Sequence, residues 1–501
     1  MPAKSADKKT EKQKTPADDR PPVIVWFRDD LRLADNPALT AAAETGAPVI
    51  PLYMDEIGSD TRRPMGGAAR WWLHGALKSL ADDLHRLGGR LILRRGSSDS
   101  VVALAREVGA QAVFWNRRYH PSAREQDADL KSALERDGVQ ATDFNGALIA
   151  EPGTVTTNDG GFYKVYTPFA RALHAKFPEI SPLKVPKRLA APVAWPDSLA
   201  LDDLKLRPTK PDWAGGLRET WTPGEAEADA VLDRFLDKNL TRYKPERDFA
   251  ANDVTSRLSP YLRFGEISPR TVWARTDAAV ATAGNDAARA SAEKFQSEVL
   301  WREFAYNLLY HLPPIERENV QSSFDDFPWA NDNAAIQAWQ AGQTGYPIVD
   351  AGMRQLWQTG WLHNRVRMVV ASFLTKDLLV DWRVGEAWFW DTLVDADPAN
   401  NPASWQWVAG SGADAAPYFR IFNPVLQGKK FDPDGTYVRT FVPEIANLPD
   451  AYIHEPWRAP ENALKKAGVV LGETYPKPIV DHGRARKRAL AAYENIKGKA
   501  A

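Results

Sequence analysis

The sequence predicts an α/β domain built on a doubly wound parallel sheet, followed by a connector and an almost wholly helical domain. Between residues 23 and 150, the short apolar runs PVIVWF, APVIPLY, GRLILR and AQAVFW alternate with helical patterns. Buried strands separated by helices are typical of a parallel sheet with helices on both faces. Residues 151–220 are rich in proline and glycine and predict a long connector, and residues 221–495 predict a helical domain.

Individual helices have recognisable ends. Asn36 and Pro37 suit a helix cap and a first turn, and an amphipathic helix over 67–87 ends at Gly88 and Gly89. Further helices are expected at 225–240, 268–282, 287–311, 333–341, 348–358, 361–379 and 384–394. The chain beyond 428 is expected to be loop, with a final basic helix at 481–497. Residues 1–22 have lysines but no apolar stretch, which predicts a disordered tail and not a signal peptide.

Composition excludes several classes of function. The chain has 501 residues, no cysteine, 44% hydrophobic and 26% charged residues, which is ordinary for a soluble protein. Disulfides, thiolate metal sites and cysteine nucleophiles are therefore excluded. The sequence has no apolar run as long as a membrane span, so we expect no membrane partner. The lack of cysteine fits a cytoplasmic compartment, and a monomer is expected. A net charge of −1 excludes a uniformly basic nucleic-acid binder but permits a local basic face.

Residues 395–428 carry the strongest functional signal. Asp395, Asp397, Asn400 and Asn401 precede tryptophans 405 and 407 within one polar segment. Carboxylates and amides suit the edges of a ring system and tryptophans suit its faces, so this mixture favours a site for a flat, polar, aromatic ligand. A metal site is disfavoured, because no histidine lies nearby in the sequence; helix capping is the simpler explanation for Asp397.

Three other segments combine polar and aromatic residues. Thr255–Ser259 places hydroxyls and an arginine at a predicted helix start, which suits an anion site or, more simply, helix capping. Glu298, Trp301 and Arg302 share one face of their helix, either as a site or as a surface ion pair. On the predicted helix 361–379, which opens WLHNRVRM, Asn364, Arg367 and Met368 share a face with the small Ala371, while Arg365 is expected to turn away. Arg367 is expected to pair with Asp395.

Several blocks resemble, in order, the motifs of the DNA photolyase and cryptochrome family, most closely its class I cyclobutane-dimer photolyases. They are WFRDDLRLADNPAL, TSRLSPYLRFGEISPR, SEVLWREF, TGYPIVDAGMRQLWQTGWLHNRVRM, DWRVGE, DADPANNPASWQW and DAAPYFRIFNP. The resemblance covers residues 23 to about 490. It implies an antenna domain, a linker and a helical domain that binds one reduced FAD in a folded form, with no metal.

The resemblance also implies site residues. The expected FAD contacts, among which Asn401 faces the flavin N5, are Tyr243, Thr255, Ser256, Arg257, Leu258, Ser259, Arg302, Asn364, Arg367, Asp395, Asp397 and Asn401. The expected partner is ultraviolet-damaged DNA, and the expected contacts to the DNA or its lesion are Arg247, Glu298, Trp301, Asn364, Arg365, Trp407, Arg420 and Gln427. The residues given a catalytic role are Glu298, Asn364, Met368 and Asn401.

The reaction implied is light-driven electron transfer from reduced FAD to a flipped cyclobutane pyrimidine dimer, which splits while the electron returns. Trp405, Trp382 and Trp329 match the chain of tryptophans that re-reduces an oxidised flavin; core packing is the simpler alternative for each. The same fold and flavin also occur in cryptochrome photoreceptors, and an electron-transfer flavoprotein is a third alternative.

The antenna chromophore is left open by the sequence. Pterin-binding relatives usually have a glutamate where this chain has His120. Methenyltetrahydrofolate, a deazaflavin, a flavin or an unoccupied site all remain compatible with that difference.

Overall fold

The computed structural model describes residues 19–56, 63–177, 179–312, 314–330, 332–414 and 419–497. The expected tail, residues 1–22, lies outside these ranges except for its last four residues. Within the described ranges, no helix combines the length and the apolar character needed to span a membrane.

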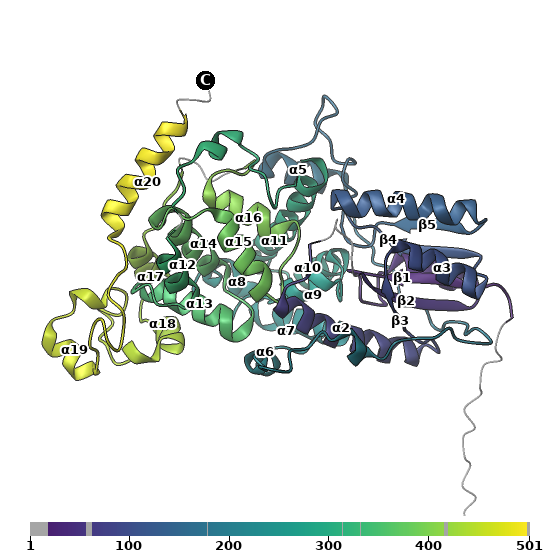
Figure 1. Cartoon of the computed structure of the whole chain (residues 1–501), viewed down its shortest axis with the longest axis horizontal. Coiled ribbons are helices and arrows are strands. Elements are labelled where there is room, and N and C mark those ends of the chain that lie inside the picture. Colours follow the sequence, from purple (N-terminus) through teal and green to yellow (C-terminus); the bar gives the residue numbers. More distant parts are fainter. Residues whose placement is uncertain are drawn as a thin grey trace, which may run out of the picture.

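The amino-terminal domain is built around a parallel sheet of order β3-β2-β1-β4-β5 (Figure 1). Successive side chains of β1 point to opposite faces of the sheet, and helices cover both faces. Val23, Val25 and Phe27 pack toward α1 and α2, and Ile24 and Trp26 pack toward α3 and α4. The strands are β1 Val23–Phe27, β2 Val49–Glu56, β3 Ile92–Gly96, β4 Ala112–Asn116 and β5 Gln140–Phe144, and the helices are α1 Pro37–Glu44, α2 Gly67–Arg86, α3 Ser98–Val108 and α4 Pro121–Arg136.

The doubly wound sheet is confirmed, and four of its five strands were predicted. The fifth, β5, has the sequence QATDF, whose polar composition gives no buried-strand signal because β5 lies at the edge of the sheet. Asn36 caps α1 as predicted, because its side chain accepts a hydrogen bond from the backbone N–H of Leu39.

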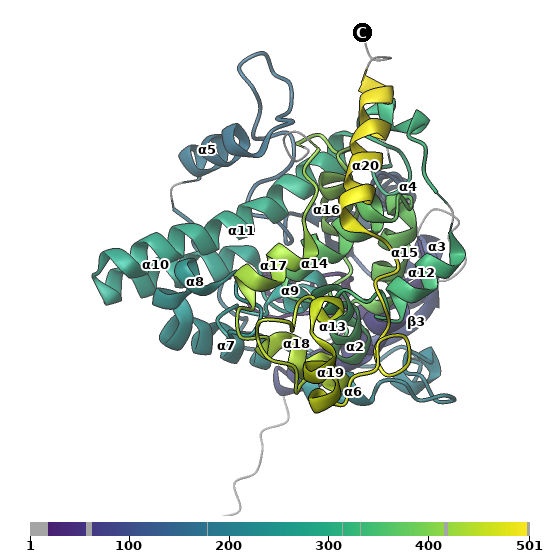
Figure 2. The same ribbon diagram turned by 90° about the vertical axis from the view of Figure 1, so that its left-hand side faces the viewer.

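The connector is more structured than its composition predicts. It contains α5 Tyr166–Lys176 and ends in α6 Gly215–Thr220. Phe169 and Leu173 anchor α5 in the core, and Phe169 packs against Phe304 of the long helix α11 with ring centroids 5.5 Å apart. The view in Figure 2 shows α5 beside one end of α11, with the loop that precedes α5 extending outward.

The helical domain contains the predicted helices, but it differs from the prediction in several places. The expected helix 225–240 continues through a π-helical segment, Phe235–Asn239, into the next helix, α8 (Leu240–Glu246). The expected helix 361–379 begins only at Asn364 and ends in a π-helical segment, Phe373–Asp377. The chain beyond 428 also holds two short helices that were expected to be loop, α18 and α19. The helices are α7 Glu225–Arg234, α8 Leu240–Glu246, α9 Ser259–Phe264, α10 Pro269–Ala283, α11 Asp286–His311, α12 Asn333–Gln340, α13 Pro347–Thr359, α14 Asn364–Ser372, α15 Trp382–Thr392, α16 Asn400–Ala409, α17 Pro424–Phe431, α18 Thr436–Phe441, α19 Glu461–Ala467 and α20 His482–Lys497.

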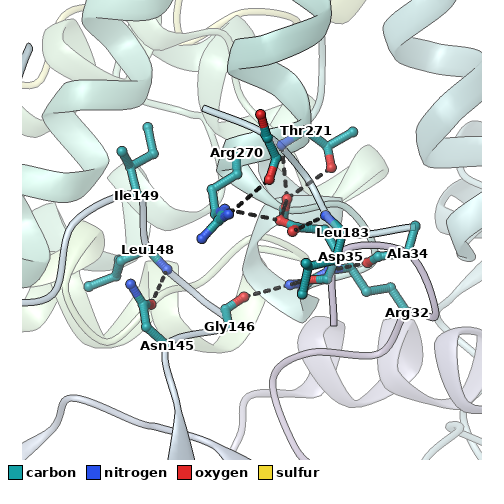
Figure 3. Close-up of polar contacts among 12 residues, drawn as sticks. Arg32, Ala34, Asp35, Asn145, Gly146, Leu148, Ile149, Leu183, Arg270 and Thr271 are labelled. Carbon is teal, nitrogen blue, oxygen red and sulfur yellow. Dashed lines mark hydrogen bonds and ion pairs between the residues drawn. The ribbon is translucent and has the colours of Figure 1, made fainter. Parts of the chain in front are cut away.

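A buried polar network joins the two domains and the connector (Figure 3). Asp35 accepts hydrogen bonds from the hydroxyl of Ser268 (2.6 Å) and from the backbone N–H of Leu183 (2.8 Å), and Arg270 lies 3.6 Å from the same carboxylate. Arg32 donates to the backbone oxygens of Gly146 and Gly265. Because these groups are buried and would be costly unpaired, the network fixes the helical domain against the sheet.

Glu303 of α11 forms a second link of this kind. Its carboxylate accepts hydrogen bonds from the backbone N–H groups of Ile149 (2.9 Å) and Ala150 (3.2 Å). Burial raises the pKa of Glu303 to about 7, although Arg302 and these two N–H groups act in the opposite direction. The carboxyl group therefore binds its proton more tightly in the folded than in the unfolded chain.

That difference predicts a pH-dependent stability. Because the folded chain holds the Glu303 proton up to a higher pH, the free energy of unfolding should fall as pH rises from 4.5 to about 7, by roughly 1–3 kcal/mol from this group. Glu303→Gln should lack that fall, as measured by urea unfolding at pH 5 and pH 7.5. Glu293→Gln, on the exposed face of the same helix, serves as the control. Equal pH dependence in Glu303→Gln and the unmodified protein would contradict the assignment.

Candidate active site

A cavity of ≈ 800 Å³ opens into the helical domain, bordered by α8, α9, α11, α14 and α16. Its volume lies within the roughly 300–1,000 Å³ that is usual for binding sites of organic ligands. The predicted site residues that line it are Tyr243, Arg247, Thr255, Ser256, Arg257, Leu258, Ser259, Glu298, Trp301, Arg302, Asn364, Arg365, Arg367, Met368, Asp395, Asp397, Asn401, Trp405 and Trp407.

Four predicted residues lie outside the cavity wall. Trp382 is fully buried and Trp329 is half-buried, and both belong to the apolar cluster around Trp405. Arg420 is exposed and packs its guanidinium over Phe422, 4.8 Å from the ring centroid, and Gln427 lies on α17. The structure thus brings together most residues of the proposed ligand site but not Arg420 and Gln427.

Arg367 and Asp395 form the predicted ion pair at the cavity wall. The Nη2–Oδ2 distance is 2.7 Å and the Nη1–Oδ1 distance is 3.2 Å, which is a bidentate arrangement. Arg367 Nε also donates to the backbone oxygen of Leu362. The side chain of Asp395 is only 3% exposed, so this pairing is what makes its buried charge tolerable.

The prediction that Arg365 turns away from the site was wrong. The helix α14 begins at Asn364, with His363 as its cap, so Arg365 lies in the first turn at the cavity edge. Its guanidinium lines the cavity and donates to Asp248 (2.8 Å). Because Arg365 lies in the first turn of α14, it borders the cavity even though Asn364, Arg367 and Met368 form a different face of that helix.

Glu298, Trp301 and Arg302, which were predicted to share one face of their helix, all line the cavity from α11. Glu298 Oε1 accepts from Arg247 and lies 2.6 Å from Lys294 Nζ. Both cations contact Oε1, so Oε2 is the oxygen that a ligand in the cavity could reach without displacing them. Lys294 and Arg247 also keep the carboxylate in place, and Lys294 was not among the predicted residues although it lies one helical turn before Glu298.

Asn401 is fixed by a carboxylate that sequence reasoning missed. Its Nδ2 donates to Glu386 Oε1 (2.8 Å) and to the backbone oxygen of Glu386 (3.1 Å). Glu386 in turn accepts from Arg63 Nη1 at 2.7 and 2.8 Å. Burial raises the pKa of Glu386, and Arg63 and Asn401 oppose that effect. With Nδ2 engaged by Glu386, Oδ1 is the acceptor that the amide can offer to a ligand.

Asp397 caps the start of α16, which was the simpler explanation for this residue from the sequence. Its Oδ1 accepts from the backbone N–H groups of Ala399 (2.9 Å) and Asn400 (2.7 Å), and its Oδ2 accepts from the hydroxyl of Tyr306 (2.8 Å). Burial raises the pKa of Tyr306, which keeps that hydroxyl protonated as a donor. Tyr306 lies one helical turn after Arg302, so its position on the same side of the predicted helix could have indicated it.

The carboxyl ends of the central strands are occupied by paired side chains. Arg28 pairs with Asp127 (2.6 Å), and Asn116 donates to Asp30 (2.6 Å). His120 lies at the start of α4, 3.3 Å from Glu316 of the helical domain. In the part of the chain that the structure describes, no group of three or more histidines, aspartates or glutamates could hold a metal ion.

The segment Thr255–Ser259 contributes the opposite wall. Arg257 adopts φ 52°, a conformation that favours glycine, and its guanidinium lies over the Trp361 ring, 5.3 Å from the centroid. Among the described residues, the buried Nε atoms of Arg257 and Arg365 have no hydrogen-bond partner. Unpaired buried donors at a cavity wall fit a ligand that carries anionic oxygens.

Comparison with known proteins identifies the family. A model described as the FAD binding domain of DNA photolyase matches residues 295–495, and one described as DNA photolyase matches residues 23–188. A deoxyribodipyrimidine photo-lyase of Agrobacterium fabrum is 55% identical over 478 residues, which cover 95% of this chain and 98% of that protein. The chain belongs to the DNA photolyase family.

Other members of the family are also similar over almost the whole chain. The crystal structure of a bacterial class III photolyase from Agrobacterium tumefaciens has a TM-score of 0.92 and 53% identity, covering 98% of this chain and 100% of that one. Cryptochrome-1 of Arabidopsis thaliana is 39% identical over 94% of this chain and 70% of its own length. The likeness to a class III structure does not single out the class I enzymes that the motifs resemble.

The photolyase cavity has the chemistry that FAD requires. The hydroxyls of Thr255 and Ser256 and the unpaired Nε of Arg257 suit the diphosphate, and Asn401 Oδ1 and the Arg367–Asp395 pair suit the polar edges of the rings. Tyr243 and Trp405 supply apolar surface for ring faces. The residues present therefore fit the flavin of the family's FAD binding domain.

The Arg367–Asp395 pair generates a prediction about stability. Arg367→Met leaves the Asp395 carboxylate buried without its partner, so the free energy of unfolding should fall by on the order of 3 kcal/mol. Arg367→Met/Asp395→Leu removes both charges and should recover much of that loss, as measured by urea unfolding of the flavin-free proteins. Equal destabilisation by the single and double substitutions would show that packing, not the unpaired charge, is responsible.

Proposed function

We propose that this protein is a deoxyribodipyrimidine photo-lyase that repairs cyclobutane pyrimidine dimers in DNA, using light and one reduced FAD. The observation that carries the proposal is that one cavity holds both sets of residues. The groups that fit FAD share its wall with Glu298, Trp301, Asn364, Met368 and Trp407, which suit a pyrimidine lesion. The 55% identity to a named photo-lyase over nearly the full length supports the same activity.

FAD, when bound in its reduced form, supplies the electron that light drives into the dimer and takes it back after the ring bonds break. The chain's own residues bind and orient. Trp301 and Trp407 provide flat apolar walls for a dimer that has been flipped out of the duplex, as photolyases do with their substrate. We expect Glu298 Oε2 to accept a hydrogen bond from an N–H on the pyrimidine edge and Asn364, which lines the same cavity, to contact the same base.

Basic residues at the rim suit the phosphates on either side of the lesion. Lys244, Arg247 and Arg365 line the cavity, while Arg420 is exposed outside the cavity wall. Such contacts position the duplex without reading its sequence, which suits an enzyme that must act wherever damage occurs. Because the chain as a whole has a net charge of −1, DNA affinity depends on this local group of cations.

Trp405, Trp382 and Trp329 are proposed to carry electrons from the surface to the flavin site. Close packing supports the first step. A Cβ atom on Gly385 would lie 2.1 Å from Trp405 Cη2, so the absence of a side chain there lets the indole lie directly against α15. Trp382 begins α15, one turn before Gly385, and its Nε1 donates to Asn319 Oδ1 (2.9 Å). Trp329, half-buried, is the surface end.

The subclass is proposed to be class III. The class III crystal structure, at 53% identity and a TM-score of 0.92, favours that assignment over the class I resemblance of the motif WLHNRVRM. The antenna chromophore, whether methenyltetrahydrofolate or a deazaflavin, stays a prediction. The contact between His120 and Glu316 favours neither of them.

One assay tests the function. Reduced protein is mixed with ultraviolet-irradiated oligothymidylate and illuminated with blue light, while the absorbance of the regenerated thymines is followed. We expect light-dependent recovery that is absent in the dark. Bound flavin without any recovery would contradict the proposal and favour a cryptochrome-type photoreceptor.

The tryptophan chain gives a separate prediction. Trp382→Phe should slow photoreduction of the oxidised enzyme by an external reductant at least tenfold (about 1.4 kcal/mol or more in barrier), because phenylalanine is harder to oxidise than tryptophan. Repair by pre-reduced Trp382→Phe should be unchanged. Trp273→Phe, a buried substitution on α10, controls for loss of a core tryptophan. Normal photoreduction in Trp382→Phe would exclude this route.

A further inference from the structure

The lesion-facing tryptophan Trp301 is stacked on a residue of the connector. The ring of Tyr166 lies parallel to the Trp301 indole, with ring centroids 3.8 Å apart and an interplanar angle of 4°. Tyr166 is the first residue of α5, whereas Trp301 lies on α11, so the pair joins the connector to the cavity wall. One face of the indole is therefore covered, and the face available to the cavity is the opposite one.

Tyr166 is held from three directions. Its hydroxyl donates to the backbone oxygen of Ser297 (2.7 Å), and its backbone N–H donates to Asp414 Oδ2 (2.8 Å). Phe304 meets both members of the pair edge-on, at 6.0 Å from the Tyr166 ring and 5.9 Å from the Trp301 ring. Asp414 itself lines the cavity. The tyrosine is thus attached both to α11 and to the loop at the cavity mouth.

This arrangement does more than packing requires. The helix α5 is already anchored by Phe169 and Leu173, which are 3% and 1% exposed, whereas Tyr166 is only half-buried. A half-buried tryptophan without a covered face could adopt several rotamers, and binding a base would then cost the entropy of selecting one of them. A parallel ring behind it fixes the indole plane before the ligand arrives.

We propose that Tyr166 is a positioning residue for lesion recognition: it holds Trp301 in the plane against which the flipped pyrimidine stacks. A bound dimer would extend the pair to a stack of three flat groups, with Tyr166 outermost and the base innermost. The connector would then contribute directly to discrimination between damaged and undamaged DNA. This inference rests on the proposed photolyase function.

The test compares Tyr166→Leu and Tyr166→Phe. Leucine fills a similar volume without a flat face, and phenylalanine keeps the face but loses the hydroxyl bond to Ser297. Dissociation constants are measured in the dark by fluorescence anisotropy, with one oligonucleotide that carries a single thymine dimer and with its undamaged counterpart. Phe169→Leu, on the same helix, is the matched control for α5 packing, because the Phe169 ring packs against Phe304.

We expect Tyr166→Leu to weaken dimer binding about tenfold, or about 1.4 kcal/mol, with undamaged DNA binding unchanged. Tyr166→Phe should stay within about twofold of the unmodified protein, and the yield of repair per absorbed photon at saturating DNA should not change in either variant. Phe169→Leu should leave the ratio of the two affinities unaltered. A purely structural role would lower the thermal midpoint without changing that ratio.

A double-substitution cycle identifies the route of the effect. If Tyr166 acts through Trp301, adding Tyr166→Leu to Trp301→Ala should cause no further loss of dimer affinity. Full additivity, or an unchanged affinity ratio in Tyr166→Leu, would overturn the inference. Failure of the unmodified protein to prefer dimer-containing DNA would instead overturn the proposed function, so the two failures are distinguishable.

Discussion

The cavity depends on the rigidity of one helix, α11, whose 26 residues contact the amino-terminal domain, stack on the connector through Trp301 and line the cavity. One part of it, through Glu303, is fixed to the backbone at Ile149 and Ala150. Another face presents Glu298, Trp301 and Arg302 to the cavity. Side chains at i, i+3 and i+4 share a face, so a rotation of α11 about its axis would move Glu298, Trp301 and Arg302 at the same time. The same rotation would break the contact between Trp301 and the connector.

Each carboxylate at the site is matched by a donor from the protein itself. Asp395 pairs with Arg367, Glu298 with Arg247 and Lys294, Asp397 with Tyr306, and Glu386 with Arg63. Buried charges without such partners would either be neutralised or move toward water. The wall is therefore preorganised before any ligand enters, and the donors left unpaired, such as Arg257 Nε, are the ones a ligand can satisfy.

The sequence predicted the contacts that follow from helical periodicity and from opposite charge. It missed the contacts that depend on where a helix begins or on how distant segments pack. The shared face of Glu298, Trp301 and Arg302 and the pair Arg367–Asp395 followed from helical periodicity and charge, and both are present. The position of Arg365 was wrong because it depended on where α14 begins. Tyr166 gave no signal at all: it lies in a segment without periodicity, and its partner Trp301 is distant in the sequence.

The amide of Asn401 shows how the two domains act on one atom of the site. Its orientation is set by Glu386, which accepts from Arg63, and Arg63 lies between β2 and α2 of the amino-terminal domain, outside the helices that form the cavity. The same guanidinium lies over the Trp390 ring of α15, 4.5 Å from its centroid, so its position is fixed on two sides. Burial raises the pKa of Glu386 and Arg63 acts against that effect, while the Asn401 Nδ2 is turned toward the Glu386 carboxyl group, so Oδ1 is the acceptor that the amide can offer to a ligand.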